Sequence, residues 1–150
     1  MKMTSLTLLT LSIAFAALLT FQNLNPPTHL GLTEGQLAPM PDKPNAVSSQ
    51  TEQADKKVEA LPFKATVEAT QQAVNNALAE LGNNEIQVQE NGYTYSVFTS
   101  PTMRYRDDVE VYLDTEAKLV HFRSQSRAGY SDMGVNRKRY EAFRQLYSQQ

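Results

Sequence analysis

The residues best suited to chemistry in this chain lie between Phe122 and Tyr140. This stretch combines five cations with one acid and several hydroxyl and amide side chains: Arg123, Arg127, Arg137, Lys138, Arg139, Asp132, Ser124, Ser126, Ser131 and Asn136. Guanidinium groups make bidentate contacts with phosphate, sulfate or carboxylate. The first backbone amides of a helix have no internal partner, and they favour a negative charge. The stretch therefore predicts a binding site for an anionic ligand or partner.

We expect nine residues to form this site: Arg123, Ser126, Arg127, Ser131, Asp132, Asn136 and Arg137, with Asp107 and Asp108 from upstream. A second interpretation gives the same residues a structural role, in which Asp132 caps the last helix and the arginines pair with Asp107, Asp108 and Glu110. Exposed pairs of this kind contribute ~0–1 kcal/mol. Buried pairs cost several kcal/mol when one partner is removed. The spacing of the nearby glycines matches neither a P-loop nor a dinucleotide fingerprint.

Catalysis stays an open question at this point, and no residue is assigned to it. A hydrolase-like enzyme using Asp107, Asp108 or His121 is the alternative to a binding or scaffold module, but no nucleophile is identifiable beside His121. No cofactor and no metal are expected. The chain has no cysteine, and its two histidines, His29 and His121, lie far apart in sequence. The formal charge of −2 gives no general attraction to nucleic acid.

The N-terminal segment, residues 1–22, predicts a membrane anchor or a signal segment. Residues 6–21 are nearly all apolar, and about 24 Å of helix would result from their sixteen residues. Lys2 on the leading side predicts a cytoplasmic N-terminus and a domain outside the cytoplasmic membrane. Ala14-Phe15-Ala16 has the form of a cleavage site but lies inside the apolar run. An uncleaved anchor, a signal cleaved on export to the periplasm, and a buried core helix remain the three alternatives.

Residues 23–61 form a Pro-rich arm, which contains Pro26, Pro27, Pro39, Pro41 and Pro44, with Pro62 next to it. Repeated proline removes amide donors and disfavours helix. Composition alone favours a flexible tether over an arm that docks on the domain. Leu37 and Val47, which stand among turn-forming residues, are the features that favour docking.

Residues 62–150 predict a compact α+β domain. Apolar residues recur at helical spacing from Thr66 to Leu81, and Gly82 supplies a stop. Asn91-Gly92 predicts a two-residue hairpin turn. That turn pairs Glu90 with Tyr93, Val88 with Tyr95 and Ile86 with Val97, and it predicts that Ile86, Val88, Tyr95 and Val97 share one buried face.

A second hairpin and a final helix complete the predicted domain. Matching the apolar faces sets Val111 opposite Phe122, Leu113 opposite Val120, Glu110 opposite Arg123 and Tyr112 opposite His121. A register shifted by two residues, which would pair Asp108 with Arg127, is the alternative. The last helix is expected to start near Ser131-Asp132 and to bury Tyr140, Phe143 and either Leu146 or Tyr147. The fold class is therefore α+β, with a four-stranded antiparallel meander sheet and two helices on one face.

The chain resembles the family known as domain of unknown function 1499 (DUF1499), from about His29 to Tyr147. The resemblance rests on Leu30-Gly31, Gly35 with 37–39, Pro44-Asn45 with 47–50, 61–63, Arg106 with 107–110, and the polar residues from Arg123 to Arg139. Many members carry cysteines where this chain has Met40 and Ala46, which implies a small disulfide loop that this chain lacks. The resemblance implies that the arm belongs to the domain, with Asn45 and 48–50 near the arginines. It supplies no reaction.

These observations lead to one functional expectation. The chain is an envelope protein with a single N-terminal span and its domain outside the cytoplasm, and it acts as a binding or scaffold module. Its expected partners are an anionic small molecule or another envelope protein, together with the membrane through residues 1–22. A purely structural ion-pair network is the remaining alternative.

Overall fold

The centre of the fold is an antiparallel meander of four strands, seen in a computed structural model that describes residues 5–150. Its strands are β3 (Asn84–Glu90), β4 (Tyr93–Thr99), β5 (Arg106–Asp114) and β6 (Leu119–Ser126). The α+β class is confirmed, but the expected strand number is wrong, because the sheet has six strands. Two short strands of the N-terminal half, β1 (Ala46–Ser48) and β2 (Leu61–Pro62), both pair with the outer edge of β6.

The Pro-rich arm is docked on the sheet, as β1 shows directly. Ala46 pairs with Gln125, and Ser48 pairs with Arg123. Leu37, Ala38 and Val47 are buried. A three-residue strand gives no periodic signal, so composition did not reveal it.

The hairpin of β3 and β4 has the predicted turn but not the predicted buried face. Asn91 and Gly92 both have positive φ, 49° and 76°, as the turn type requires. Two of the predicted pairs are confirmed, Glu90 with Tyr93 and Val88 with Tyr95. An irregularity between Ile86 and Val88 sets Ile86 opposite Ser96 instead of Val97, so the third pair is wrong.

The buried residues of β4 are Thr94, Ser96 and Phe98, whereas Ile86 and Val88 of β3 are exposed. The predicted face is wrong because α2 covers the polar side of this hairpin. There the Thr94 hydroxyl accepts a hydrogen bond from Gln71, and the Ser96 hydroxyl donates one to Asn84. A buried polar residue with a partner costs little, so alternation did not identify the covered face.

The second hairpin is confirmed pair for pair. Val111 lies opposite Phe122, Leu113 opposite Val120, Glu110 opposite Arg123 and Tyr112 opposite His121. The apolar members of these pairs are buried, and they fix the register.

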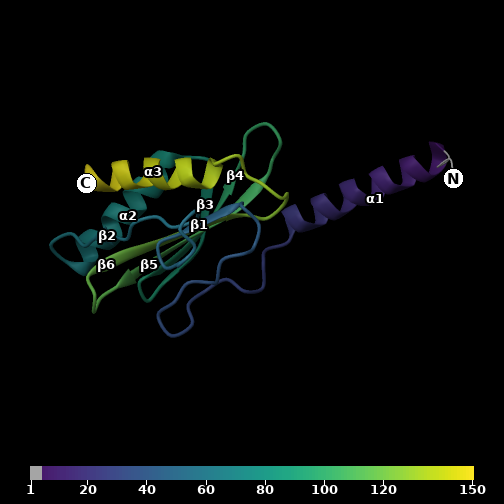
Figure 1. The fold of residues 1–150 in the computed structure, drawn as a ribbon. Coiled ribbons are helices and arrows are strands. Elements are labelled where there is room, and N and C mark those ends of the chain that lie inside the picture. The colour runs from purple at the N-terminus through teal and green to yellow at the C-terminus, as the bar shows by residue number, and fades with distance from the viewer. Residues whose placement is uncertain (1–4) are drawn as a thin grey trace.

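Two helices pack against one face of this sheet (Figure 1). In α2 (Val67–Leu81), Thr66 accepts a hydrogen bond from the Ala69 amide at the N-cap, and Gly82 ends the helix. In α3 (Val135–Ser148), Tyr140, Phe143 and Tyr147 are buried, and the rings of Phe122 and Phe143 lie 5.0 Å apart. The Pro-rich arm runs over the opposite face of the sheet (Figure 1).

The expected start of the last helix near Ser131-Asp132 is wrong by about one turn. The helix begins at Val135, after Gly134 in a left-handed conformation. Asp132 still satisfies the first turn, because its carboxylate accepts hydrogen bonds from the amides of Gly134 and Asn136.

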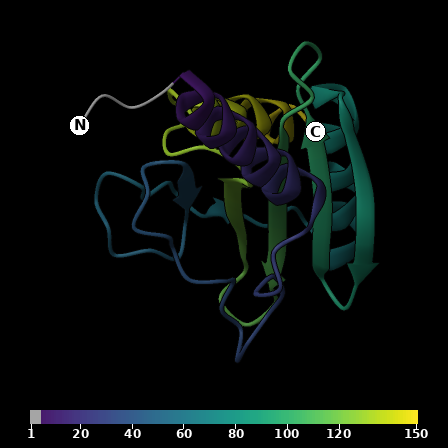
Figure 2. The same ribbon diagram turned by 90° about the vertical axis from the view of Figure 1, so that its right-hand side faces the viewer.

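The N-terminal apolar helix, α1 (Ser5–Leu24), projects away from the sheet and helices (Figures 1 and 2). Within it, Thr7–Leu24 is long and apolar enough to cross a membrane, and no residue of this window is buried. Lys2, from which the orientation is predicted, lies outside the described residues.

Candidate functional site

Alternation along β5 and β6 sends the charged residues to opposite faces of the sheet. Asp107 and Ser124 lie on the face covered by α2 and α3, which we call the helix face. Asp108, Glu110 and Arg123 lie on the face covered by residues 23–50, which we call the arm face. The predicted site is therefore divided by the sheet.

On the arm face, Arg123 and Glu110 form an ion pair whose side chains are both fully buried. Nη1 of Arg123 donates to Oε2 of Glu110 at 3.0 Å. The other carboxylate oxygen, Oε1, accepts from the Gly31 amide and from the Tyr93 hydroxyl, each at 2.7 Å. Nη2 of Arg123 donates to the Pro39 carbonyl at 3.2 Å. The pair therefore binds the arm as well as the sheet.

Burial shifts the pKa values of Arg123 and Tyr93 in opposite directions. It lowers the pKa of Arg123, and the negative charge of Glu110 opposes that shift. Burial also raises the pKa of Tyr93, and the charge of Glu110 raises it further, so the phenol stays a hydrogen-bond donor. Nε of Arg123 has no hydrogen-bond partner among residues 5–150.

A second ion pair on the arm face joins Arg127 to Asp108. Nη2 of Arg127 lies 2.7 Å from Oδ1, and Nε lies 3.0 Å from each carboxylate oxygen. The Tyr95 hydroxyl donates to Oδ1 at 2.6 Å and accepts from Arg127 at 2.9 Å. Burial, followed by the hydrogen bond to Asp108, raises the pKa of Tyr95. Nη1 of Arg127 reaches the carbonyl of Asn23 at the end of α1, 3.4 Å away.

On the helix face, a third pair joins Arg139 to Asp107 at 2.6 Å. Arg139 also donates to Asn136 Oδ1 at 2.7 Å and to the Ser124 hydroxyl at 2.9 Å. Asn136 is fully buried and acts as the hub of this group. Its side-chain nitrogen, Nδ2, shares its two hydrogens among three acceptors, the Asn45 carbonyl, the Ser126 hydroxyl and the Asp132 carboxylate.

The start of α3 is satisfied from within the chain. Beyond the two amides bound by Asp132, the Val135 amide donates to the Asp132 carbonyl at 3.1 Å. Ser131 accepts from the Met133 amide, and Arg137 donates to the carbonyls of 55 and 57. These contacts use the donors on which an anion site at this helix start would depend.

The structure thus separates the nine predicted residues into three places. Arg123, Arg127 and Asp108 lie on the arm face, and Asp107, Ser126 and Asn136 lie on the helix face. Ser131 and Arg137 border a small cavity of about 170 Å³ at the start of α3, and Asp132 lines this cavity while it also binds Asn136. Ligand binding by these nine residues stays a prediction.

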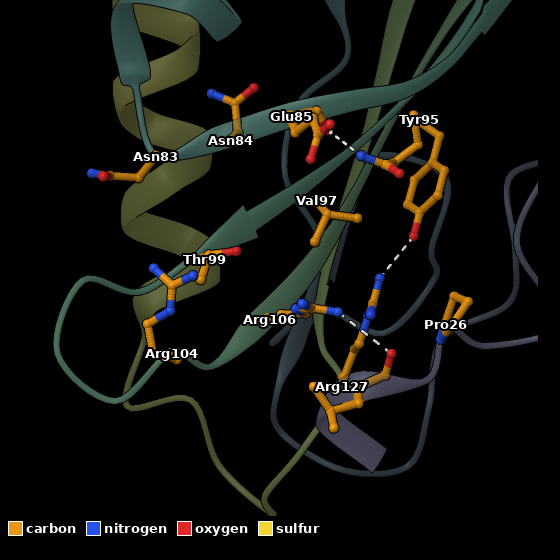
Figure 3. Close-up of a pocket in the computed structure, with 12 residues that line it drawn as sticks. Pro26, Asn83, Asn84, Glu85, Tyr95, Val97, Thr99, Arg104, Arg106 and Arg127 are labelled. Atoms are coloured by element: carbon orange, nitrogen blue, oxygen red, sulfur yellow. Dashed lines mark hydrogen bonds between the residues drawn. The ribbon is translucent and has the colours of Figure 1, made fainter. Parts of the chain in front are cut away.

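A larger cavity, of about 480 Å³, lies where the end of α1 meets the outer face of β3 and β4 (Figure 3). Arg104, Arg106 and Arg127 lie on its side nearest α1, and Asn84 and Glu85 of β3 lie opposite (Figure 3). The sequence analysis did not predict this cavity.

The arginines of this cavity differ in how they are paired. Arg127 is neutralised by Asp108. Among residues 5–150, the Arg106 guanidinium has one hydrogen-bond partner, the Leu24 carbonyl 3.5 Å away, and the Arg104 guanidinium has no hydrogen bond or ion pair. Glu85 is the one carboxylate in the lining. Two guanidinium groups without a carboxylate partner therefore face the cavity.

The Asn23 side chain makes the shortest hydrogen bonds between the end of α1 and this cavity, beside those that Arg127 and Arg106 donate to the carbonyls of Asn23 and Leu24. The Asn23 side-chain amide donates to the Arg104 carbonyl at 2.9 Å and accepts from the Arg106 amide at 2.7 Å. Asn23 follows directly after the apolar run. Nothing in its sequence context marks it as a partner of residues more than 80 positions away.

His121 also has a partner that the sequence did not suggest. Its Nδ1 lies 3.1 Å from the Ser49 hydroxyl, and its Nε2 lies 3.9 Å from Asp114. Burial lowers the pKa of His121, and Asp114 opposes that shift. The Ser49 oxygen also accepts from the Phe122 amide at 3.0 Å, so Ser49 joins the arm to β6. His121 contacts neither Asp107 nor Asp108 in the described part of the chain.

An antiparallel sheet with two helices on one face, an extended arm on the other and an apolar N-terminal helix defines an α+β domain with one candidate membrane helix. The chain belongs to the family described as "Protein of unknown function (DUF1499)", which it matches over residues 36–146. The resemblance drawn from the motifs is confirmed. The matched range includes all three ion pairs described above. No curated protein and no solved structure matches the chain.

Proposed function

We propose that this chain is a single-pass membrane protein whose domain lies outside the cytoplasm and binds an anionic group beside its anchor. The anchor is α1, whose twenty residues correspond to about 30 Å of helix, the thickness of a hydrocarbon core. The hydrogen bonds of Asn23 favour an uncleaved anchor, because they join the end of α1 to the domain. Export to the periplasm after cleavage remains the alternative.

The observation that carries the binding proposal is the pair of guanidinium groups in the 480 Å³ cavity. Arg104 and Arg106 have no carboxylate partner, although three other arginines of the domain have buried ones. Arginines left without acids beside a cavity favour phosphate or carboxylate ligands. Arg127 also lines this cavity, and its hydrogen bonds with Asp108 and Tyr95 fix the position of its side chain.

The predicted polar cluster takes a supporting part in this proposal. Its buried ion pairs hold the arm and Arg127 in place, as a scaffold for the cavity. This role combines the binding module with the structural network that the sequence left as alternatives.

The test is calorimetric titration of the full chain, in detergent, with inorganic phosphate. Arg104→Gln and Arg106→Gln should each weaken binding about tenfold, since one hydrogen bond to a charged group contributes about 1.5–3 kcal/mol. Arg144→Gln is the matched control, because Arg144 is exposed at the far end of α3 and paired with Glu141. Phosphate binding that is equally strong in all three variants would overturn the proposal.

A hydrolase is the second candidate, and the contact between Ser49 and His121 is the observation that favours it. A neutral imidazole that accepts from a serine hydroxyl is the arrangement of an activated nucleophile. Full-length protein should then hydrolyse an activated ester, and Ser49→Ala should abolish the turnover. Equal turnover by both proteins, or none by either, would exclude this activity for Ser49.

A further inference from the structure

Exposed apolar side chains outside α1 are concentrated on two segments. They are Met103 and Tyr105 in the β4–β5 loop, Tyr130 and Met133 between β6 and α3, and Val135 at the first position of α3. Met133 is 88% exposed, Tyr130 72% and Met103 65%. Elsewhere in the described domain the exposed large hydrophobics are Ile86 and Val88 on β3. Such a concentration on a protein surface marks an interaction site.

Both segments lie where α1 leaves the domain (Figures 1 and 2). The Asn23 side chain bonds the backbone of Arg104 and Arg106 at the end of the first segment. The Asn23 carbonyl accepts from Arg127 at the beginning of the second. The Arg127 amide in turn donates to the Arg106 carbonyl at 3.1 Å, so the end of the first segment lies beside the beginning of the second.

The length of α1 sets how deep these segments would lie. A helix of about 30 Å crosses the hydrocarbon core and brings Leu24 to its edge. Groups bonded to Asn23 then lie at the level of the lipid headgroups. Tyrosine is enriched at that level, where its ring is in the apolar region and its hydroxyl in the polar one. This step rests on the proposed anchoring by α1.

The charges of the two segments complement a lipid surface. Residues 100–106 contain two arginines and no acid. The one acid between Arg127 and Gly134 is Asp132, whose carboxylate is engaged by the first turn of α3. Basic residues next to a membrane span are attracted to anionic headgroups by about 1 kcal/mol each.

We propose that these two loops are a second membrane-binding element, in which Met103, Tyr105, Tyr130 and Met133 enter the interface and Arg104 and Arg106 bind lipid phosphates. The anionic ligand of the 480 Å³ cavity is then a phospholipid headgroup. The domain lies against the bilayer at this end, and the β5–β6 turn, Asp114–Lys118, points into water. That turn exposes Thr115, Glu116, Ala117 and Lys118.

A single tryptophan tests the placement, because the chain contains none. Tyr130→Trp places the reporter in the second loop, and Thr115→Trp is the matched control at the opposite end of β5. Each full-length variant is reconstituted into vesicles of phosphatidylcholine and phosphatidylglycerol, with and without acyl-brominated lipid. We expect a blue-shifted emission and strong quenching for Tyr130→Trp, and neither for Thr115→Trp. Met133→Trp replaces the first variant if that protein does not fold.

The outcomes separate this inference from the proposal beneath it. If the protein does not float with the vesicles at all, α1 is not an anchor and both proposals fail. If it floats but both reporters give the emission of tryptophan in water, the anchor stands and the loop contact is overturned. Quenching that persists in Arg104→Gln/Arg106→Gln, with unchanged dependence on phosphatidylglycerol, would overturn the role of the two arginines. Phosphate binding to the same full-length protein in detergent distinguishes a free anion from a headgroup.

Discussion

On the helix face of the sheet, Val109, Val111 and Phe122 pack against α2 and α3, whereas on the arm face Glu110 with Arg123 and Asp108 with Arg127 occupy the buried positions. The segments that cover the two faces differ in how their backbone groups are hydrogen-bonded. A helix satisfies its own backbone and offers an apolar stripe. The arm has few internal hydrogen bonds, and it offers amides and carbonyls.

The charged side chains of the sheet bind individual backbone groups of the arm and of the end of α1. Glu110 accepts from the Gly31 amide, Arg123 donates to the Pro39 carbonyl, and Arg127 donates to the Asn23 carbonyl. The comparison shows why buried charges occur on this face: a segment without regular structure is docked through its backbone. An apolar surface would leave those backbone groups without partners.

The strongest test of this comparison is Arg123→Leu. We expect a loss of about 3–5 kcal/mol in the free energy of unfolding, because Glu110 would remain buried without its cation. Urea unfolding of the full chain in detergent measures it. Adding Glu110→Leu should recover part of the loss. A loss no larger than that of Arg144→Leu, an exposed residue, would show that the pair does not hold the arm.

Asp107 and Asp108 give a matched pair on adjacent residues that face opposite sides. Asp108→Asn should cost about 3 kcal/mol, because Arg127 and Tyr95 both depend on a carboxylate that is 1% exposed. Asp107→Asn should cost about 1–2 kcal/mol, since its pair with Arg139 is partly open to water and serves no arm contact. Thermal unfolding of the two variants side by side decides the order; the reverse order would contradict the distinction between the faces.

Two tyrosine hydroxyls, one bound to a carboxylate and one to a carbonyl, allow the same comparison with smaller expected losses of stability. Tyr95→Phe removes a hydroxyl bound to a carboxylate, and about 1.5–3 kcal/mol should be lost. Tyr147→Phe, whose hydroxyl donates to the Pro62 carbonyl at 2.8 Å, should lose about 0.5–1.5 kcal/mol. Urea midpoints give both values, and equal losses would show that the charge of Asp108 adds nothing to this hydrogen bond.

The smallest effect is a pH dependence from His121, at the boundary between the arm and β6. Burial lowers its pKa below the ordinary value of 6.5, so between these two pKa values the unfolded chain binds more protons than the folded one. Stability from this group is therefore complete above pH 6.5 and decreases as the pH falls towards the folded pKa. His121→Gln should flatten this part of the stability profile. An unchanged slope would assign the dependence to other groups.

The sequence predicts the part of the fold that repeats a pattern. The register of β5 and β6 was predicted by setting Val111 opposite Phe122 and Leu113 opposite Val120, and the structure has this register and not the one shifted by two residues. The strand β1 has three residues and no alternation to recognise, and its place beside β6 depends on contacts that are distant in sequence. The predicted buried face of β4 was wrong because Thr94 and Ser96 are buried on the other face, where hydrogen bonds satisfy their hydroxyl groups.

The candidate site also has one part that the sequence pattern predicts and one part that it does not. The pairing of arginines with Asp108 and Glu110 could be predicted, because adjacent strands bring opposite charges together. The cavity of Arg104 and Arg106 could not, because it forms only when Asn23 at the end of α1 meets the β4–β5 loop. That meeting is a tertiary contact for which no local residue pattern exists.

The partnership of β1 with β6 also governs the order in which the chain can fold. Asn45 and its partner Ser126 are 81 residues apart, so this edge of the sheet closes only after almost the whole polypeptide has been made. Closing so long a loop is entropically costly, and a high contact order slows folding. In a newly made chain, β1 therefore stays unpaired until β6 has been made, and this edge of the sheet closes late in folding.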